Sequence, residues 1–195
     1  GKSTILRLIA GLYTPERGSV RVFGRTPRKV AREVAYLPQV AHLFEGSIRQ
    51  NLSLLSDASA EKLELAAEQS GLAAFVATLP MGYETILPAG GSTLSGGQRQ
   101  LIMWTAAMAS GRRLLLLDES LSQVDRVTRS RLLAMCDQHA CTIVSVDHEP
   151  LTRCRLASND VQELENAPLS RDPFESQRRS SGVVTQLIQE TRYGD

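Results

Sequence analysis

The sequence predicts an α/β fold with a mainly parallel sheet core and an inserted helical subdomain. The chain opens with Gly1-Lys2-Ser3-Thr4, the second half of a phosphate-binding loop, directly before apolar residues at helical spacing. A short, wholly apolar run from Leu114 to Leu117 is typical of a strand buried on both faces of a parallel sheet. A mostly helical pattern over residues 43–110 separates these two features.

The composition indicates one globular domain without a nucleic-acid partner. The 195 residues suit a single domain, and 22 basic against 21 acidic residues leave no basic excess. Cys136, Cys141 and Cys154 lack the paired spacing of a zinc site, so we expect small core residues in a reducing compartment. No apolar run approaches the roughly 18 residues of a membrane span, and no signal peptide opens the chain. We therefore expect a chain that is soluble and cytosolic by itself.

The first helix is predicted over residues 2–12 by its apolar spacing. Ile5, Leu8, Ile9 and Leu12 recur on one face. The phosphate-loop pattern G-x-x-x-x-G-K-[ST] survives only in its last positions, so we expect a fragment that lacks the first glycine and the strand before it.

Two strands are predicted next. Val20 and Val22 alternate with polar residues, which favours a strand that ends near Gly24. Residues 34–37 form a buried-looking strand with Gln39 just beyond its end. Ligands of open α/β sheets bind beyond the carboxyl ends of strands, so Gln39 is a candidate site residue.

The segment from 43 to 110 is predicted to be mostly helical. Ile48, Leu52 and Leu55 lie at helical spacing, and a helix over residues 60–70 is closed by Gly71 as its C-terminal cap. The helix after Ser95 is apolar nearly all round, which indicates deep packing with Trp104 as a core anchor.

The pentapeptide from Leu94 to Gln98 is suited to hold an anion. Ser95 and Gln98 have the spacing of a capping box at a helix start. Gly96 and Gly97 leave the backbone amides open to a phosphate oxygen at the positive end of the helix dipole.

Asp118 and Glu119 follow the buried strand. Two acids at the end of a buried strand cost desolvation unless a cation offsets it, which favours a metal site. Asp125 can cap a helix that runs to about Gln138, and a strand over residues 142–146 leads to His148.

Over about residues 1–150, these motifs and their order resemble the ATP-binding cassette (ABC) ATPases. Residues 43–52 and 79–85 resemble the exporter branch, and the general likeness is to bacterial exporters of peptides, bacteriocins and toxins. The resemblance implies a P-loop NTPase fold. Its expected parts are a partial ATPase core (1–42), a helical subdomain that ends in the signature helix (43–110), a second part of the core (111–160) and a weakly defined tail (161–195).

The resemblance also implies ATP hydrolysis with Mg²⁺. The implied catalytic residues are Lys2, Gln39, Glu119 and His148, and the implied metal residues are Ser3, Gln39 and Asp118. The implied ATP-binding residues are Gly1, Lys2, Ser3, Thr4, Leu94, Ser95, Gly96, Gly97, Gln98 and Asp125. The implied partners are a transmembrane domain and a second ABC ATPase domain, paired head to tail, at the cytoplasmic face of the bacterial inner membrane.

Several residues depart from the family's pattern. They are Ala89, Leu101, Ser120 with Leu121, and Asp147 beside the expected switch histidine. They leave open an alternative, a catalytically weak or regulatory module of an asymmetric pair. The retained Glu119 favours a hydrolysing motor, because loss of a general base costs about 10²–10⁴ in rate. A DNA-repair or chromosome-organising ATPase would require coiled coils or zinc cysteines, which the sequence lacks.

Overall fold

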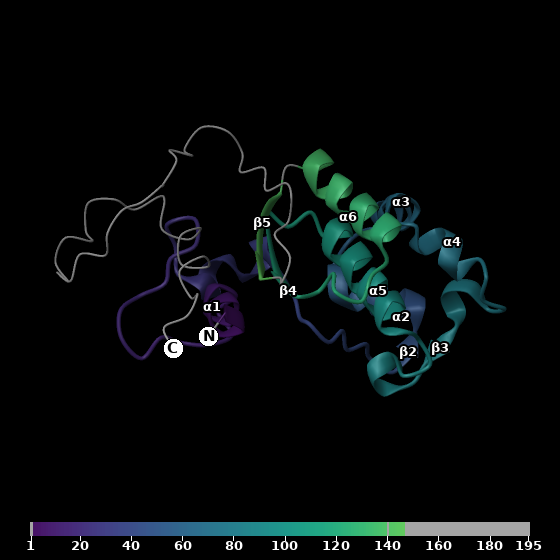
Figure 1. The fold of residues 1–195 in the computed structure, drawn as a ribbon, viewed down its shortest axis with the longest axis horizontal. Helices are drawn as coiled ribbons and strands as arrows, with labels where there is room; N and C mark the ends of the chain where they lie inside the picture. The colour runs from purple at the N-terminus through teal and green to yellow at the C-terminus, as the bar shows by residue number, and fades with distance from the viewer. Residues whose placement is uncertain (1, 140, 147–195) are drawn as a thin grey trace.

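Three parallel strands form the central sheet in the part of the chain that the computed structural model describes, residues 2–139 and 141–146 (Figure 1). The central sheet contains β1 (Val34–Leu37), β4 (Leu114–Asp118) and β5 (Thr142–Val146). A separate pair contains β2 (Gly46–Ser47) and β3 (Ile86–Leu87). The α-helices are α1 (Lys2–Ile9), α2 (Ile48–Ser56), α3 (Ala60–Ser70), α4 (Leu72–Val76), α5 (Gly96–Ala109) and α6 (Arg126–Gln138). Short 3₁₀ helices are η1 (Pro27–Glu33), η2 (Gly82–Glu84) and η3 (Ala89–Gly91).

The central sheet has the order β1-β4-β5, so the predicted buried strand is in its middle. β1 pairs with β4 from Val34 opposite Leu114 to Leu37 opposite Leu117. β5 pairs with β4 on the other side, and its last residue, Val146, lies opposite Asp118. All three strands therefore end at one edge of the sheet, where Asp118 is the last residue of β4, Glu119 follows it, and Gln39 lies just beyond β1.

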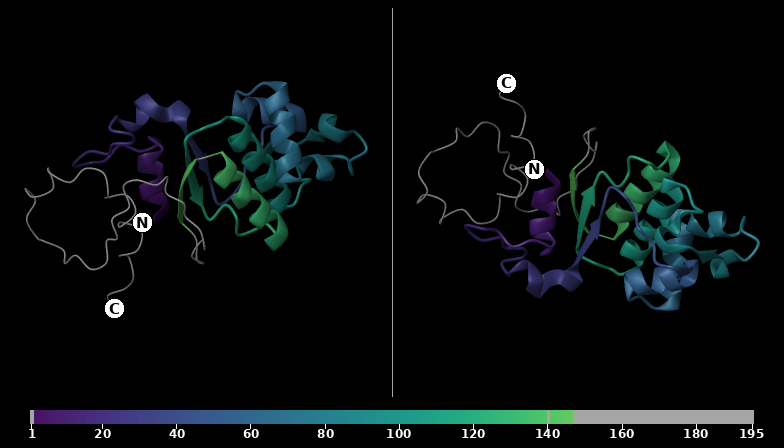
Figure 2. Two further views of the ribbon diagram at one scale, coloured as in Figure 1. Left: turned by 90° about the horizontal axis from the view of Figure 1, so that it is seen from above. Right: turned by 90° about the horizontal axis from the view of Figure 1, so that it is seen from below.

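Each face of the sheet is covered by a different set of helices (Figure 2). Leu114 and Leu116 pack with Leu6 and Ile9 of α1, whereas the alternate residues of β4 pack in the larger cluster that includes α5. Side chains alternate between the faces of a strand, so a wholly apolar strand supplies both layers. The continuous run of leucines is thereby explained.

The helices on the far face pack around α5. Trp104 has no exposed surface and Ile102 beside it is equally buried, which confirms the predicted core role of the tryptophan. Gly71 ends α3 with a φ of 87°, in the left-handed region that favours glycine, as predicted. Cys136 is buried and Cys141 is half-buried.

Two local predictions near the N-terminus were wrong. The first helix ends at Ile9, and Leu12 is 60% exposed. The expected strand at Val20–Gly24 is a tight turn in which Val22 bridges Arg25, with Phe23 and Gly24 at φ values of 50° and 72°. The alternation of the valines reflects burial against α1, because Val22 belongs to the same cluster as Leu6.

The segment from 43 to 110 also holds a feature that its helical pattern did not predict. β2 and β3 form a two-residue antiparallel pair, with Ser47 opposite Ile86. Within the described residues, no helix is long and apolar enough to span a membrane. Asp147, His148, Cys154 and the tail at 161–195 lie outside the described residues.

Candidate functional site

Ser3 and Asp118 meet at the carboxyl edge of the sheet. Ser3, on the first turn of α1, donates its hydroxyl proton to Oδ1 of Asp118 over 2.8 Å, although the two residues are 115 positions apart in sequence. Asp118 is only 3% exposed. A buried carboxylate requires hydrogen-bond donors or a cation, so the local structure is built around this charge.

The second oxygen of Asp118 also has a partner. The hydroxyl of Tyr36, on β1, donates to Oδ2 over 2.8 Å. Burial raises the pKa of Tyr36, and the hydrogen bond to Asp118 raises it further, so the hydroxyl keeps the proton that it donates. Sequence reasoning missed Tyr36, whose only signal was a polar atom within an apolar strand.

Glu119 directly follows Asp118 and turns away from the strand. Its φ of 51° is left-handed, a conformation that a non-glycine residue rarely adopts. Its backbone N–H donates to the carbonyl of Val146 over 2.8 Å. The amide Nε2 of Gln39 donates to Oε2 of Glu119 over 2.6 Å, so the structure brings two of the predicted catalytic residues together.

Gln100 fixes the backbone that carries Gln39. Its side-chain amide Nε2, on α5, donates to the carbonyls of Pro38 and Gln39, each over 3.0 Å. Gln100 is 1% exposed, and its Oε1 has no hydrogen-bond partner among the described residues. The helix that begins at Ser95 is therefore connected to the carboxyl edge of the sheet. Sequence reasoning missed this contact, because periodicity indicates contacts only within a helix or strand and these residues are 62 positions apart.

The capping box at Ser95 is confirmed. The Gln98 N–H donates to the Ser95 hydroxyl over 3.2 Å, and the Ser95 N–H donates to Oε1 of Gln98 over 2.8 Å. Leu94 beneath it is buried. A Cβ on Gly97 would lie 2.6 Å from the backbone oxygen of Gln123. Gly97 is therefore required for packing against the loop before α6, in addition to any role in anion binding.

Asp125 is confirmed as the N-cap of α6. Its carboxylate accepts from the backbone N–H groups of Val127 and Thr128, each over 3.0 Å. These hydrogen bonds lower the pKa of Asp125. A role of Asp125 at a nucleotide stays a prediction.

The remaining predicted residues are separated. Lys2 and Thr4 lie on the first turn of α1 and are exposed, whereas Ser95 begins α5, which packs on the opposite face of the sheet. Gly1 and His148 lie outside the described residues. The structure thus brings Ser3, Gln39, Asp118 and Glu119 to one edge and leaves the signature pentapeptide apart from them.

The residues at this edge fit a magnesium ion. Ser3 supplies a hydroxyl and Asp118 a buried carboxylate within hydrogen-bond distance of each other, and Mg²⁺ prefers such oxygen ligands. Magnesium is usually bound by one or two carboxylates together with phosphates and water. Among residues 2–139 and 141–146, no group of three acidic, histidine or cysteine side chains is arranged to hold a metal ion by itself.

Most of the residues that depart from the family's pattern are buried. Leu101 and Leu121 are buried in the large core cluster. Ser120 is 1% exposed, and its hydroxyl has no partner within the described ranges. Ala89 is exposed at the start of η3. Asp147 lies outside the described residues.

The fold and the edge of the sheet define the class: the chain has the α/β fold of a P-loop NTPase, with Ser3 of the loop bonded to Asp118 at a strand end. Residues 1–122 match the family model described as ABC transporter. The chain belongs to the ABC transporter family, whose ATP-binding domains hydrolyse ATP to drive transport.

Relatives and a solved structure agree with this assignment. The chain is 40% identical over 154 residues to the ABC transporter ATP-binding protein RamB of Streptomyces coelicolor, covering 76% of the chain and 25% of RamB. It is 33% identical over 155 residues to the lactococcin-A transport/processing ATP-binding protein LcnC of Lactococcus lactis, covering 76% of the chain and 22% of LcnC. The structure of a bacterial Atm1-family ABC exporter with ATP bound is 30% identical with a TM-score of 0.70, covering 76% of the chain and 27% of the exporter. The chain thus spans about a quarter of the length of these proteins.

Proposed function

We propose that this chain binds and hydrolyses ATP as the nucleotide-binding domain of an exporter. The observation that carries the proposal is the meeting of Ser3 with Asp118 and of Gln39 with Glu119 at one edge of the sheet. A loop hydroxyl beside a buried carboxylate suits a phosphate-bound metal, and a neighbouring carboxylate suits a general base. The exporter with ATP bound that matches in fold supports ATP as the nucleotide.

Each residue at the edge has a role in this proposal. Lys2 places its charge on the phosphates, while Ser3 and Asp118 hold Mg²⁺, which when bound would neutralise the phosphate oxygens. Glu119 accepts the proton of the attacking water, and Gln39 orients Glu119 through its amide. His148 and Asp125 are proposed to contact the nucleotide in the paired state.

We further propose that two such domains pair head to tail. α1 and α5 pack on opposite faces of the sheet, so Lys2 and Ser95 of one chain cannot enclose one nucleotide together. A second ABC domain that supplies its own Ser95 to Gln98 segment would complete each site. The confirmed capping box supports this role, because it aligns free amides at the start of α5.

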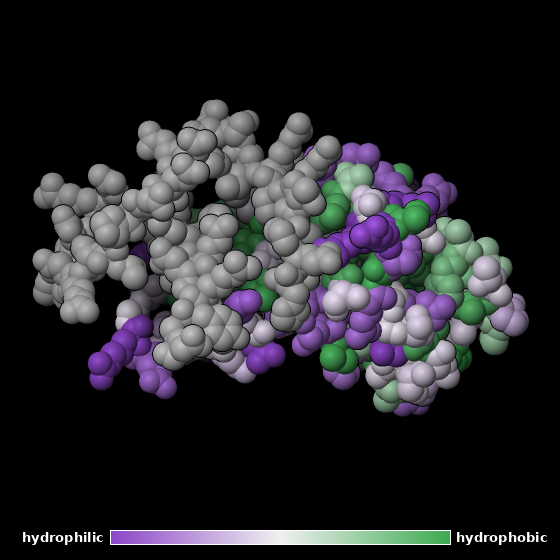
Figure 3. Space-filling model, viewed as in Figure 1, coloured by the Kyte–Doolittle hydropathy of each residue, from purple (hydrophilic) through white to green (hydrophobic). Residues whose placement is uncertain are grey.

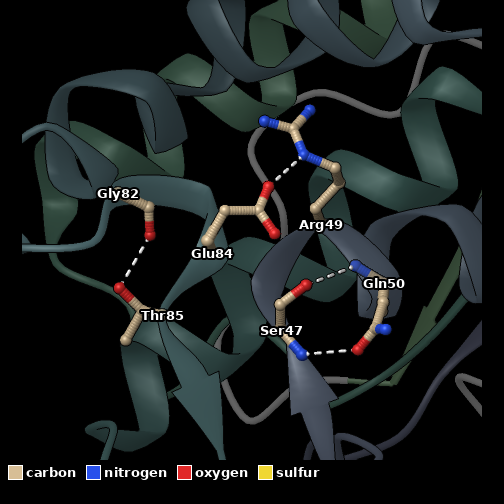
Figure 4. Close-up of polar contacts among 6 residues, drawn as sticks. All are labelled: Ser47, Arg49, Gln50, Gly82, Glu84 and Thr85. Atoms are coloured by element: carbon tan, nitrogen blue, oxygen red, sulfur yellow. Dashed lines mark hydrogen bonds and ion pairs between the residues drawn. The ribbon is translucent and has the colours of Figure 1, made fainter.

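The membrane domain is proposed to contact the end of the molecule that holds β2 and β3. Phe44, Met81 and Ile86 expose 56%, 61% and 62% of their surface there. Beside them, Arg49 pairs with Glu84 over 2.5 Å, and Ser47 and Gln50 cap α2 (Figure 4). Apolar residues interspersed with hydrophilic ones at this end suit a protein partner (Figure 3). The domain would then lie at the cytoplasmic face of the membrane. The name of LcnC supports a peptide as the transported substrate.

Glu119→Gln tests hydrolysis directly. We expect the substitution to lower ATP turnover by at least about 10²-fold while an ATP-dependent dimer persists, because the amide cannot accept the proton but fills the same space. Phosphate release and size-exclusion chromatography of the full-length protein with Mg²⁺ and ATP measure both effects.

The control is Asp137→Asn, an exposed carboxylate near the end of α6 that is outside both the proposed site and the proposed contact face. It should leave turnover within about twofold of wild type, because surface substitutions away from such features have small effects. ATP binding by wild type without any turnover would contradict the motor and favour the regulatory module.

A further inference from the structure

We propose that Tyr36 is a positioning residue for the metal ligand Asp118, held in place by Arg7. This inference rests on the proposed function and deepens it, because it assigns the second oxygen of the Mg²⁺-binding carboxylate to a tyrosine. Tyr36 acts through Asp118 and makes no contact with the nucleotide in the proposal.

Both oxygens of the Asp118 carboxylate are occupied from the protein side. Ser3 donates to Oδ1 and the hydroxyl of Tyr36 donates to Oδ2, each over 2.8 Å. A carboxylate held at both oxygens cannot rotate about its last bond without losing a hydrogen bond. Tyr36 therefore restricts Asp118 to the orientation in which Oδ1 faces Ser3.

The hydroxyl of Tyr36 is itself oriented by α1. The Nε of Arg7 donates to this hydroxyl over 3.4 Å, so the hydroxyl proton is left for Asp118. Arg7 is one helical turn after Ser3, and residues four apart share a face of a helix. Helix α1 thus contacts Asp118 in two ways. Ser3 bonds to it directly, and Arg7 bonds to the hydroxyl of Tyr36, which bonds to Asp118.

The consequence is a dependence of metal binding on a residue that never touches the metal. Hydrogen-bond partners of metal ligands typically contribute about 10–100-fold to metal affinity, because they fix the ligand's orientation. Tyr36→Phe keeps the aromatic ring but removes the hydroxyl that donates to Oδ2. Tyr13→Phe is the matched control, since Arg7 also donates to the Tyr13 hydroxyl over 3.2 Å, but that hydroxyl is not bonded to Asp118.

The experiment measures ADP affinity by calorimetry on the full-length protein, once in excess Mg²⁺ and once in EDTA. The ratio of the two affinities isolates the metal's contribution. We expect Tyr36→Phe to lower this ratio by about tenfold or more while the affinity in EDTA is unchanged, and Tyr13→Phe to leave both values at the wild-type level. A general structural defect would instead weaken binding in both buffers.

Several outcomes would overturn the inference: an unchanged ratio in Tyr36→Phe, an equal loss in both buffers, or the same loss in Tyr13→Phe. If Tyr36→Phe does not fold, Arg7→Met takes its place, and a ratio within twofold of wild type would overturn the role of the relay. Because ADP is not hydrolysed, the result is separate from the proposed function. If wild type binds ADP more tightly in Mg²⁺ than in EDTA but does not hydrolyse ATP, the proposed hydrolysis would be wrong. The inference about Tyr36 would still hold if Tyr36→Phe lowered the affinity ratio.

Discussion

Among single residues, Gln100 shows how one buried amide connects α5 with the carboxyl edge of the sheet. Its Nε2 donates to two successive carbonyls at the end of β1, and the second belongs to Gln39, which contacts Glu119. A single side chain therefore determines where the backbone of Gln39 lies. The unpartnered Oε1 of Gln100 adds a cost that the two donated hydrogen bonds must offset.

We expect Gln100→Leu to lower the free energy of unfolding by about 1–3 kcal/mol, because two carbonyls lose their donor. Turnover should fall as well, since Gln39 is no longer fixed beside Glu119. Urea denaturation and phosphate release measure the two effects. Gln138→Leu, at the exposed end of α6, serves as control and should change neither; a stable Gln100→Leu with normal turnover would contradict the prediction.

At the scale of the element, two helices begin with the same capping geometry but with different proposed roles. Ser47 with Gln50 starts α2, and Ser95 with Gln98 starts α5, with equal hydrogen-bond lengths of 3.2 and 2.8 Å in each box. Figure 4 shows the first of these boxes. Capping stabilises both helices alike. Any difference between the two serines in their effect on ATP turnover must therefore come from contacts outside the helix.

We expect Ser47→Ala and Ser95→Ala each to lower the free energy of unfolding by about 1 kcal/mol, the usual loss of an N-cap side chain. Only Ser95→Ala should also slow ATP turnover, because only that serine is proposed to reach a nucleotide. Thermal melts and phosphate release on both variants give the comparison. Equal slowing by the two variants would mean that Ser95 acts through helix stability alone.

At the scale of the whole molecule, the sheet separates the two halves of the proposed site. α1 covers one face, and the cluster that contains α5 covers the other. One chain therefore presents the phosphate loop and the signature pentapeptide on different sides of the sheet. In our proposal, a second domain completes each site for this reason.

Ser95→Arg tests this arrangement. A bulky cation at the exposed N-cap should block closure on the partner's nucleotide, so turnover should fall to background while ATP binding at the same chain's Lys2 stays within about twofold of wild type. Calorimetry and phosphate release measure the two. Ser92→Arg, also exposed and three residues earlier, should be normal. Loss of binding in Ser95→Arg would indicate that both elements serve one nucleotide in a single chain.

Features whose signals are local could be predicted from the amino-acid sequence alone. The capping box at Ser95, the N-cap at Asp125 and the C-cap at Gly71 were predicted because a cap is made within one turn of its helix. The buried central strand was predicted because four successive leucines bounded by charged residues fit a short strand with apolar layers on both sides. The alternation of apolar and polar residues from Val20 to Gly24 gave a wrong prediction. A strand also requires a neighbouring strand to hydrogen-bond its backbone, and here Val22 bridges only Arg25.

The side chains that surround Asp118 and Gln39 come together only through the packing of distant segments. Tyr36 reaches Asp118 across 82 positions, and Gln100 reaches Gln39 across 61. Gly97 contacts the backbone of Gln123 because α5 and the loop before α6 come together in space. No spacing in the sequence encodes these pairs, because they arise from the parallel register that brings the ends of β1 and β4 to one edge, where buried polar groups must find partners.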